Sequence, residues 1–331
     1  MRAFIRSYWL LLISLTFLCI VTIVWKSFDQ QGKTVANEKV LPDSTWHPPS
    51  LFTDRVLAGE QRRLVIYGQD LIARTALYFG PKGSIANISN GMNCQNCHLQ
   101  AGKKTWGNNY GAVASTYPRF RDRSGTIESI YKRVSDCFER SLNGMAPDSN
   151  SVEYQAIEAY IKWVGNETPR GVTPTGTGIF KLPYIKRAAD PTKGKIAYQQ
   201  KCQSCHGDEG QGQLASNGIL FEYPPLWGKH SYNTGAGLYR LSRFAGYIYS
   251  NMPWNQTRHD NPVLSIDECW DIAAFVNSQP RPAKDLSQDW PDISKKPVDH
   301  PFGPFHDGFS EREHKYGPFE PIVAKRKKFK K

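Results

Sequence analysis

Residues 94–98 read C-Q-N-C-H and residues 202–206 read C-Q-S-C-H, so one five-residue motif occurs twice in a chain of 331 residues. In a C-x-x-C-H motif, both cysteine sulfurs bond to the vinyl groups of a haem and the adjacent histidine ligates its iron. A structural zinc site would need a second Cys or His pair at a fixed spacing, and neither copy offers one. The sequence therefore predicts two covalently bound haem c groups. They would be held by Cys94, Cys97 and His98 and by Cys202, Cys205 and His206.

The same order of parts surrounds both motifs. A helix-like run precedes each motif, at 68–80 and at 192–201. A methionine follows each motif, and then an amphipathic run with aromatic residues, at 151–164 and at 265–276. A c-type cytochrome domain has this layout: a helix, the C-x-x-C-H motif, a distal ligand and a helix that carries aromatic residues. The repeat therefore predicts that this layout occurs twice.

The predicted fold is mainly α, with two cytochrome c-like haem domains in tandem at 51–168 and 188–283. The linker at 168–178 is rich in Pro, Gly and Thr and has no periodic pattern. Residues 284–331 are dense in Pro and Phe, and we expect an irregular segment that wraps over the domains and ends in a basic tail.

The formal net charge of +12 is concentrated at the end of the chain, because the last seven residues read K-R-K-K-F-K-K. The folded body is therefore only mildly basic. We expect a disordered basic tail that touches an acidic partner or lipid headgroups. Nucleic-acid binding is not expected, since no recognition motif accompanies the charge.

The first 27 residues are predicted to be a membrane anchor or a signal segment. Residues 8–25 form an apolar run behind Arg2 and Arg6, long enough to span a bilayer. No A-x-A cleavage site follows closely, which favours an uncleaved anchor. By the positive-inside rule the rest of the chain is exported, so we expect a periplasmic protein tethered to the inner membrane.

The second haem has one clear candidate for its distal ligand. Met252 follows His206 at a suitable distance along the chain and is itself followed by Pro253. His230 and His259 are the rivals, and both lie in polar, loop-like surroundings. The sequence therefore predicts His206 and Met252 as the ligands of the second iron.

The first haem has two candidate distal ligands. Met145 stands at nearly the same offset from His98 as Met252 does from its histidine, so the internal repeat favours Met145. Cys137 is the rival. Residues 126–144 are predicted to form one helix, on which Arg133, Cys137 and Ser141 fall at i, i+4 and i+8 beside the apolar face. Packing does not require an arginine, a thiol and a hydroxyl on one stripe.

A disulfide is a third reading of Cys137. With four cysteines assigned to haem and Cys19 inside the anchor, Cys137 and Cys269 remain, in an oxidising compartment. Cys269 could equally pack as a small hydrophobic residue beside Trp270. The residues alone leave the thiol ligand, the methionine ligand and the disulfide open.

Beyond the anchor, most of the chain resembles the dihaem c-type cytochrome thiosulfate dehydrogenases, some of which also run as tetrathionate reductases. The resemblance rests on G-M-N-C-Q-N-C-H at 91–98, on R-D-R-S-G-T-I-E-S-I-Y-K-R-V-S-D-C-F-E-R-S-L-N-G at 121–144, on the second C-x-x-C-H with N-M-P at 251–253, and on D-G-F-S-E-R-E-H-K-Y-G-P-F at 307–319. The block at 121–144 is the specific part, because C-x-x-C-H alone would fit any cytochrome c.

The resemblance implies roles for individual residues. Cys137 would be the axial ligand of a catalytic haem, and Arg123, Arg133 and Ser141 would bind the anionic substrate. The His206/Met252 haem would transfer electrons, and Met145 would not be a ligand.

The implied reaction joins two thiosulfates to one tetrathionate and releases two electrons. Both compounds are dianions, for which arginine supplies a fixed positive charge and a suitable fork of donors. Arg119 and Arg121 either add to this field or are solvated. A thiolate ligand lowers the haem potential and a methionine raises it, so electrons would pass from the first haem to the second. The resemblance also implies a transient sulfur–sulfur adduct between Cys137 and one thiosulfate.

Other functions would use the same two motifs differently. A membrane-tethered dihaem electron-transfer cytochrome would need no arginine cluster and would most simply use Met145. A haem-thiolate sulfur-transfer subunit would need a partner chain, and a dihaem peroxidase would need an open iron. For the enzyme we expect an electron partner such as a small cytochrome or a membrane redox protein.

Overall fold

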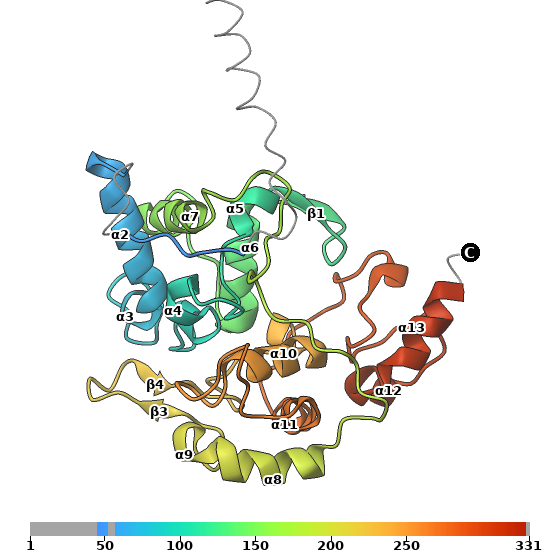
Figure 1. Cartoon of the computed structure of the whole chain (residues 1–331). Coiled ribbons are helices and arrows are strands. Elements are labelled where there is room, and N and C mark those ends of the chain that lie inside the picture. Colours follow the sequence, from blue (N-terminus) through green and yellow to red (C-terminus); the bar gives the residue numbers. More distant parts are fainter. Residues whose placement is uncertain (1–44, 52–56, 329–331) are drawn as a thin grey trace, which may run out of the picture. The chain divides into compact units, whose positions relative to one another are not determined.

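The computed structural model describes residues 45–51 and 57–328. Figure 1 shows the arrangement of the elements. Up to residue 180, the helices and helical turns are α2 (Gly59–Ala73), α3 (Thr75–Phe79), η1 (Cys94–Asn96), α4 (Leu99–Gly102), α5 (Val113–Thr116), α6 (Ile130–Asp136), the π turn η2 (Cys137–Ser141) and α7 (Val152–Val164).

Beyond residue 180 the described chain is also mainly helical. Its helices and turns are α8 (Pro191–Lys201), α9 (Gln203–His206), η3 (Gly237–Tyr239), α10 (Leu241–Asn251), α11 (Ile266–Ser278), η4 (Ile293–Lys295), α12 (Glu311–Tyr316) and α13 (Phe319–Lys328). Two small antiparallel sheets pair β1 (Arg119–Arg121) with β2 (Thr126–Glu128) and β3 (Gln213–Leu214) with β4 (Phe221–Tyr223). The prediction of a mainly α fold is confirmed.

The internal repeat is visible as two crossed helix pairs. In the first copy α2 packs on α7, and in the second copy α8 packs on α11. Each crossing contains a glycine. A Cβ atom on Gly68 would clash with the carbonyl oxygen of Ala156, and one on Gly194 would clash with that of Asp271. Each pair of helices therefore approaches more closely than any side chain at the crossing would allow.

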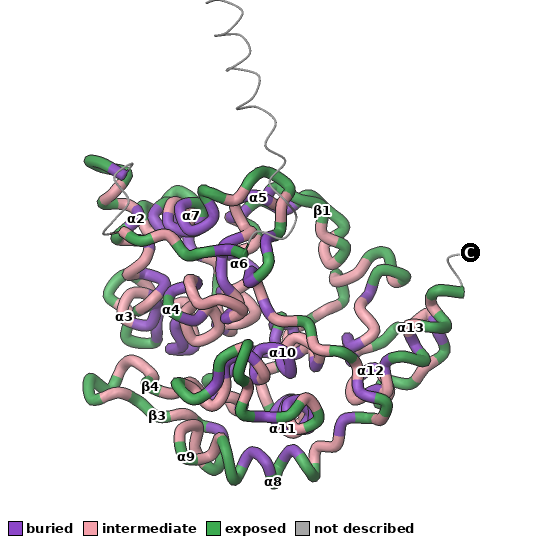
Figure 2. The backbone as a smooth tube through the Cα atoms, viewed as in Figure 1, coloured by how far each residue is buried: buried purple, intermediate pink, exposed green. Residues whose placement is uncertain are grey.

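The helices that close each pair begin where the sequence predicted. The Ser151 hydroxyl accepts a hydrogen bond from the Tyr154 N–H and caps α7, and the Ser265 hydroxyl caps α11 in the same way through Glu268. Figure 2 shows buried residues along α7, α10 and α11. These helices supply much of the core, including the fully buried Trp270.

The close crossing gives a prediction for stability. Replacing Gly194 by alanine should lower the free energy of unfolding of the haem-loaded protein by about 1–3 kcal/mol, because the added methyl group forces α8 away from α11. Denaturant titration followed by circular dichroism measures the loss. Gly237→Ala is the control, since a Cβ atom there would meet no atom within 4 Å. Equal stability of the two variants would contradict this account of the crossing.

The prediction of one helix over 126–144 is wrong in its first part. Residues Thr126–Glu128 form β2 instead, since Gly125, with φ of 66°, closes a tight turn between the two strands. The helix α6 then begins after Ser129, whose hydroxyl accepts from the Lys132 N–H. It ends in a wider π turn, where the N–H of Leu142 donates to the carbonyl oxygen of Cys137 at 2.9 Å.

The predicted helix at 68–80 also differs from the observed one. The helix α2 begins earlier, at Gly59, and a break at Arg74 separates it from α3. Thr75, at the break, uses its hydroxyl to bond the carbonyl oxygen of Leu71 and to accept from the Cys94 N–H. Thr75 therefore links the end of α2 to the first C-x-x-C-H motif.

The prediction of irregular structure throughout 284–331 is wrong for its last part, which holds α12 and α13. Ser310 and Glu313 form a reciprocal capping box at the start of α12. On α13, the side chains of Phe319 and Ile322 are almost completely buried. The basic run up to Lys328 continues α13, so the expectation of a disordered tail is wrong for its described residues.

No helix in the described ranges is both long and apolar enough to cross a membrane. The predicted anchor at 1–27, with Cys19, lies outside the described residues.

Candidate active site

A cavity of about 710 Å³ brings the first C-x-x-C-H motif together with the turn that carries Cys137. Elements from three parts of the chain form its walls: the motif, the end of α6 with its π turn, and the linker that follows α7. Several predicted site residues line it, namely Cys94, Cys97, His98, Arg133, Cys137 and Ser141. The predicted stripe on the 126–144 segment therefore faces the predicted haem position.

Both motif histidines are held in the same way. Nδ1 of His98 lies 2.5 Å from the carbonyl oxygen of Asn108, and Nδ1 of His206 lies 2.9 Å from that of Pro224. A carbonyl oxygen only accepts, so each Nδ1 carries the proton and each Nε2 is left to ligate iron. Burial lowers the pKa of His98 to about 4 and also lowers that of His206. Both rings are thus kept in the neutral form that binds metal.

The second cavity contains the second motif and Met252. Its other walls are mostly apolar and include Leu226, Phe244 and Tyr247. The rivals His230 and His259 are not among the residues that line it. The structure thus brings Met252 to the same cavity as His206, as the prediction for the second haem requires.

The two cavities share a wall. Cys97 lines both of them, and the neighbouring Asn96 lines the second. The Tyr247 hydroxyl, on α10, donates to the Asn96 carbonyl oxygen at 2.9 Å and so fixes the two motif regions to each other. Electrons leaving one haem would therefore have a short path to the other.

The three readings of Cys137 have different outcomes in the structure. Cys137 lines the first cavity. Met145 is 62% exposed and does not line it. Cys137 and Cys269 are both free thiols, and Cys269 is fully buried inside α11. Cys137 therefore faces the cavity without a disulfide partner, whereas Met145 lies outside the cavity lining. The assignment of Cys137 as the ligand of the first haem stays a prediction.

Arginines give this cavity a positive charge. Arg133 lines it, and its guanidinium has no hydrogen bond or ion pair with any described residue. The charge of the Cys137 sulfur raises the pKa of Arg133, although burial opposes this. Arg119 and Arg121 also line the cavity, and the nearest ion-pair contact of Arg121 is a distant one of 3.9 Å to Glu128. The cavity is therefore suited to an anion.

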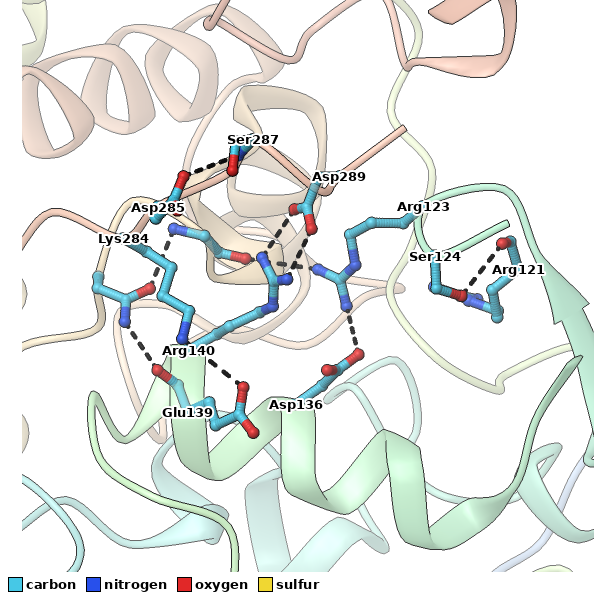
Figure 3. A network of polar contacts seen from close by, with 12 residues as sticks. Arg121, Arg123, Ser124, Asp136, Glu139, Arg140, Lys284, Asp285, Ser287 and Asp289 are labelled. Atoms are coloured by element: carbon cyan, nitrogen blue, oxygen red, sulfur yellow. Dashed lines mark hydrogen bonds and ion pairs between the residues drawn. The ribbon is translucent and has the colours of Figure 1, made fainter. Parts of the chain in front are cut away.

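Arg123 is placed differently, as Figure 3 shows. Its guanidinium donates to Asp136 at 3.0 Å, and it does not line the cavity. Burial and the nearby Arg133 and Arg140 lower its pKa. Its predicted role in anion binding stays a prediction, since the structure shows it paired beside the cavity and contributing to the same positive field.

Arg243 lines this cavity although it belongs to the second cytochrome copy, on α10. Residue patterns around the first motif could not have identified it, because only tertiary packing brings α10 to the first cavity.

Each cavity presents the side chains that would hold a haem c. Two thiols and a histidine with its Nδ1 tied to a carbonyl lie at the wall, and a sulfur side chain from a later element lines the same cavity. Among the described residues no cluster of three or more His, Cys, Asp or Glu side chains could hold a metal ion alone. The donor set is therefore that of a haem protein.

Comparison with known proteins agrees with this geometry. Residues 84–169 match the family described as SoxA/TsdA, cytochrome c domain, and residues 191–280 match the cytochrome c family. The thiosulfate dehydrogenase of Stutzerimonas stutzeri (strain A1501) is 34% identical over 257 residues, covering 78% of this chain and 80% of that protein. The thiosulfate dehydrogenase of Psychrobacter arcticus is 37% identical over 208 residues, covering 62% of this chain and 61% of that protein.

A solved structure is similar as well. It is the thiosulfate dehydrogenase (TsdBA) from Marichromatium purpuratum in its "as isolated" form, with a TM-score of 0.64 and 31% sequence identity. The match covers 72% of this chain and 50% of that chain, so this chain spans about half the length of the solved protein. Together with the two motifs and their cavities, these similarities place the chain in the thiosulfate dehydrogenase family of cytochromes with two covalently bound haem c groups.

Proposed function

We propose that this chain is an oxidoreductase that interconverts thiosulfate and tetrathionate at its first cavity. The observation that carries the proposal is the joint placement of the Cys137 thiol and the unpaired Arg133 guanidinium on the wall of the first haem cavity. Relatives that are 34% and 37% identical to this chain bear the name thiosulfate dehydrogenase. A pure electron carrier would have no need for unpaired arginines at this position.

Arg133 and Ser141 suit the binding of a sulfonate group. A guanidinium donates two parallel hydrogen bonds to oxygens of one anionic group. The Ser141 hydroxyl lines the same cavity and makes no hydrogen bond within the described part of the chain, so it is free to donate to a further oxygen. The positive field also offsets the repulsion between two dianions that must approach each other.

Cys137 supplies the reacting sulfur, and together with His98 it would ligate the iron of the first haem when that haem is bound. Its thiolate bonds to the outer sulfur of one thiosulfate, and two electrons are released as Cys–S–S–SO₃⁻ forms. The sulfane sulfur of a second thiosulfate then attacks the adduct sulfur that is bonded to Sγ of Cys137. The bond to Sγ breaks, so that tetrathionate leaves and the Cys137 thiolate is restored. Arg133 lines the same cavity as Cys137 and adds positive charge beside the sulfur at which the anions react. When bound, the two haems supply the capacity to take up the two electrons.

The proposal is tested by mixing the oxidised haem-loaded protein with thiosulfate and following the absorbance of reduced haem. Reduced protein is mixed with tetrathionate in the converse experiment. We expect reduction in the first case and reoxidation in the second. A protein that responds to neither compound would be an electron carrier without its own substrate, and the proposed function would be wrong.

The location and the electron partner belong to the same proposal. The apolar run at 8–25 supports a periplasmic enzyme tethered to the inner membrane. A small cytochrome or a membrane redox protein would exchange electrons with the second haem. Membrane fractionation of cells that express the full chain tests the tether, and release of all the protein into the soluble periplasmic fraction would refute it.

A further inference from the structure

Arg243 is a partly buried cation that lacks an acidic partner. It lies in the first turn of α10 and lines the first cavity. Its neighbour Arg240 is held by Asp299 through contacts of 2.7 and 2.9 Å. The Arg243 side chain, in contrast, has no hydrogen bond or ion pair with any residue that the structure describes. The helix therefore pairs one arginine with a carboxylate and directs the other to the cavity.

Most of the charged side chains near this arginine are positive. Burial lowers the pKa of Arg243 to about 10, and the charges of Arg240, Arg133 and Arg121 act in the same direction. The carboxylate of Asp299, which is bonded to Arg240, opposes this shift without forming an ion pair with Arg243. The group is nevertheless a cation at neutral pH. Two unpaired guanidinium groups, those of Arg133 and Arg243, thus face one cavity from different cytochrome copies. Such an arrangement is unfavourable unless an anion with suitably placed oxygens joins it.

Tetrathionate carries a sulfonate group at each end of a four-sulfur chain, whereas thiosulfate has only one. Arg133 stands four residues before Cys137 and lines the same cavity, so it is placed for the sulfonate next to the reacting sulfur. We propose that Arg243 binds the outer sulfonate of tetrathionate, so that both cytochrome copies build the anion site. This inference rests on the proposed function and adds a substrate-binding residue that lies outside the first copy.

A haem propionate is the other source of anionic oxygens in this cavity. The two sources have different consequences. Loss of a propionate contact shifts the reduction potential of the first haem and leaves substrate binding in place, whereas loss of a sulfonate contact weakens tetrathionate binding and leaves the potential in place.

The test compares the haem-loaded wild type with Arg243→Gln and with Arg258→Gln. Arg258 is a matched control, because it lies in the same copy, is 74% exposed and pairs only with Asp260. Three quantities are measured: KM for tetrathionate reduction, the calorimetric Kd of tetrathionate for the fully oxidised protein, and the reduction potential of the first haem. Losing a charge-assisted pair should raise KM and Kd for tetrathionate by about 10- to 100-fold in Arg243→Gln. Arg258→Gln should match wild type.

The outcomes separate this inference from the proposed function. Unchanged KM and Kd, with or without a shifted potential, would overturn the role of Arg243. A wild type that turns over neither compound would refute the proposed function, and the Kd comparison would still decide whether Arg243 binds the anion. If Arg243→Gln does not retain haem, Arg243→Lys keeps the charge without the fork and should give an intermediate Kd; a wild-type value there would contradict the proposal.

Discussion

Replacement of Cys137 by alanine is expected to lower both thiosulfate oxidation and tetrathionate reduction by roughly 1000-fold or more, because it removes the sulfur that forms the covalent adduct. Cys137 is a free thiol on the wall of the first cavity, next to the unpaired Arg133. Steady-state assays in both directions measure the loss. The absorption spectrum of the first haem should change at the same time, since its proposed sulfur ligand is gone.

Met145→Leu is the control for this experiment. Met145 is the ligand that the internal repeat favours, yet its side chain is largely exposed and lies outside the cavity. The substitution should therefore leave the rates and both haem spectra close to those of wild type. The assignment fails if Cys137→Ala retains normal turnover, or if Met145→Leu alters the first haem spectrum in its place.

Helical spacing in the sequence was sufficient to predict which side chains near Cys137 would line the first cavity together. Arg133, Cys137 and Ser141 share a helix stripe, and the structure brings all three to one cavity. The hairpin before this helix and the π turn within it could not be predicted. A turn at Gly125 depends on backbone geometry that apolar spacing does not reveal.

Contacts between the two copies were the other feature that the sequence could not predict. Arg243 reaches the first cavity only because α10 packs against the first motif region, where Tyr247 bonds Asn96. The same limit applies to Arg123, which the family resemblance assigns to the anion but the structure pairs with Asp136. Local patterns identify which residues share an element. They do not identify which carboxylate a cation will meet in the folded chain.

The π turn that carries Cys137 is anchored to the C-terminal extension by an ion pair. Arg140 donates two hydrogen bonds to Asp289, at 2.7 and 2.8 Å, and Figure 3 shows the two side chains aligned fork to fork. The side chains are only 12% and 9% exposed. Next to them, the backbone N–H of Trp290 donates to the carbonyl oxygen of Arg123 at 2.7 Å. A segment far along the chain therefore holds the turn that positions the reacting sulfur.

Replacing Asp289 by alanine should lower the free energy of unfolding by about 3–5 kcal/mol, because it leaves the Arg140 guanidinium buried without its partner. Denaturant titration of the haem-loaded protein measures this loss. Asp285→Ala is the matched control, since Asp285 is exposed and bonds only the Ser287 N–H; its effect should stay within about 0.5 kcal/mol. Removing both charges in Arg140→Met/Asp289→Leu should restore much of the stability, because no unpaired charge then remains. If the double variant is as unstable as Asp289→Ala, packing of the extension and not the ion pair stabilises the turn.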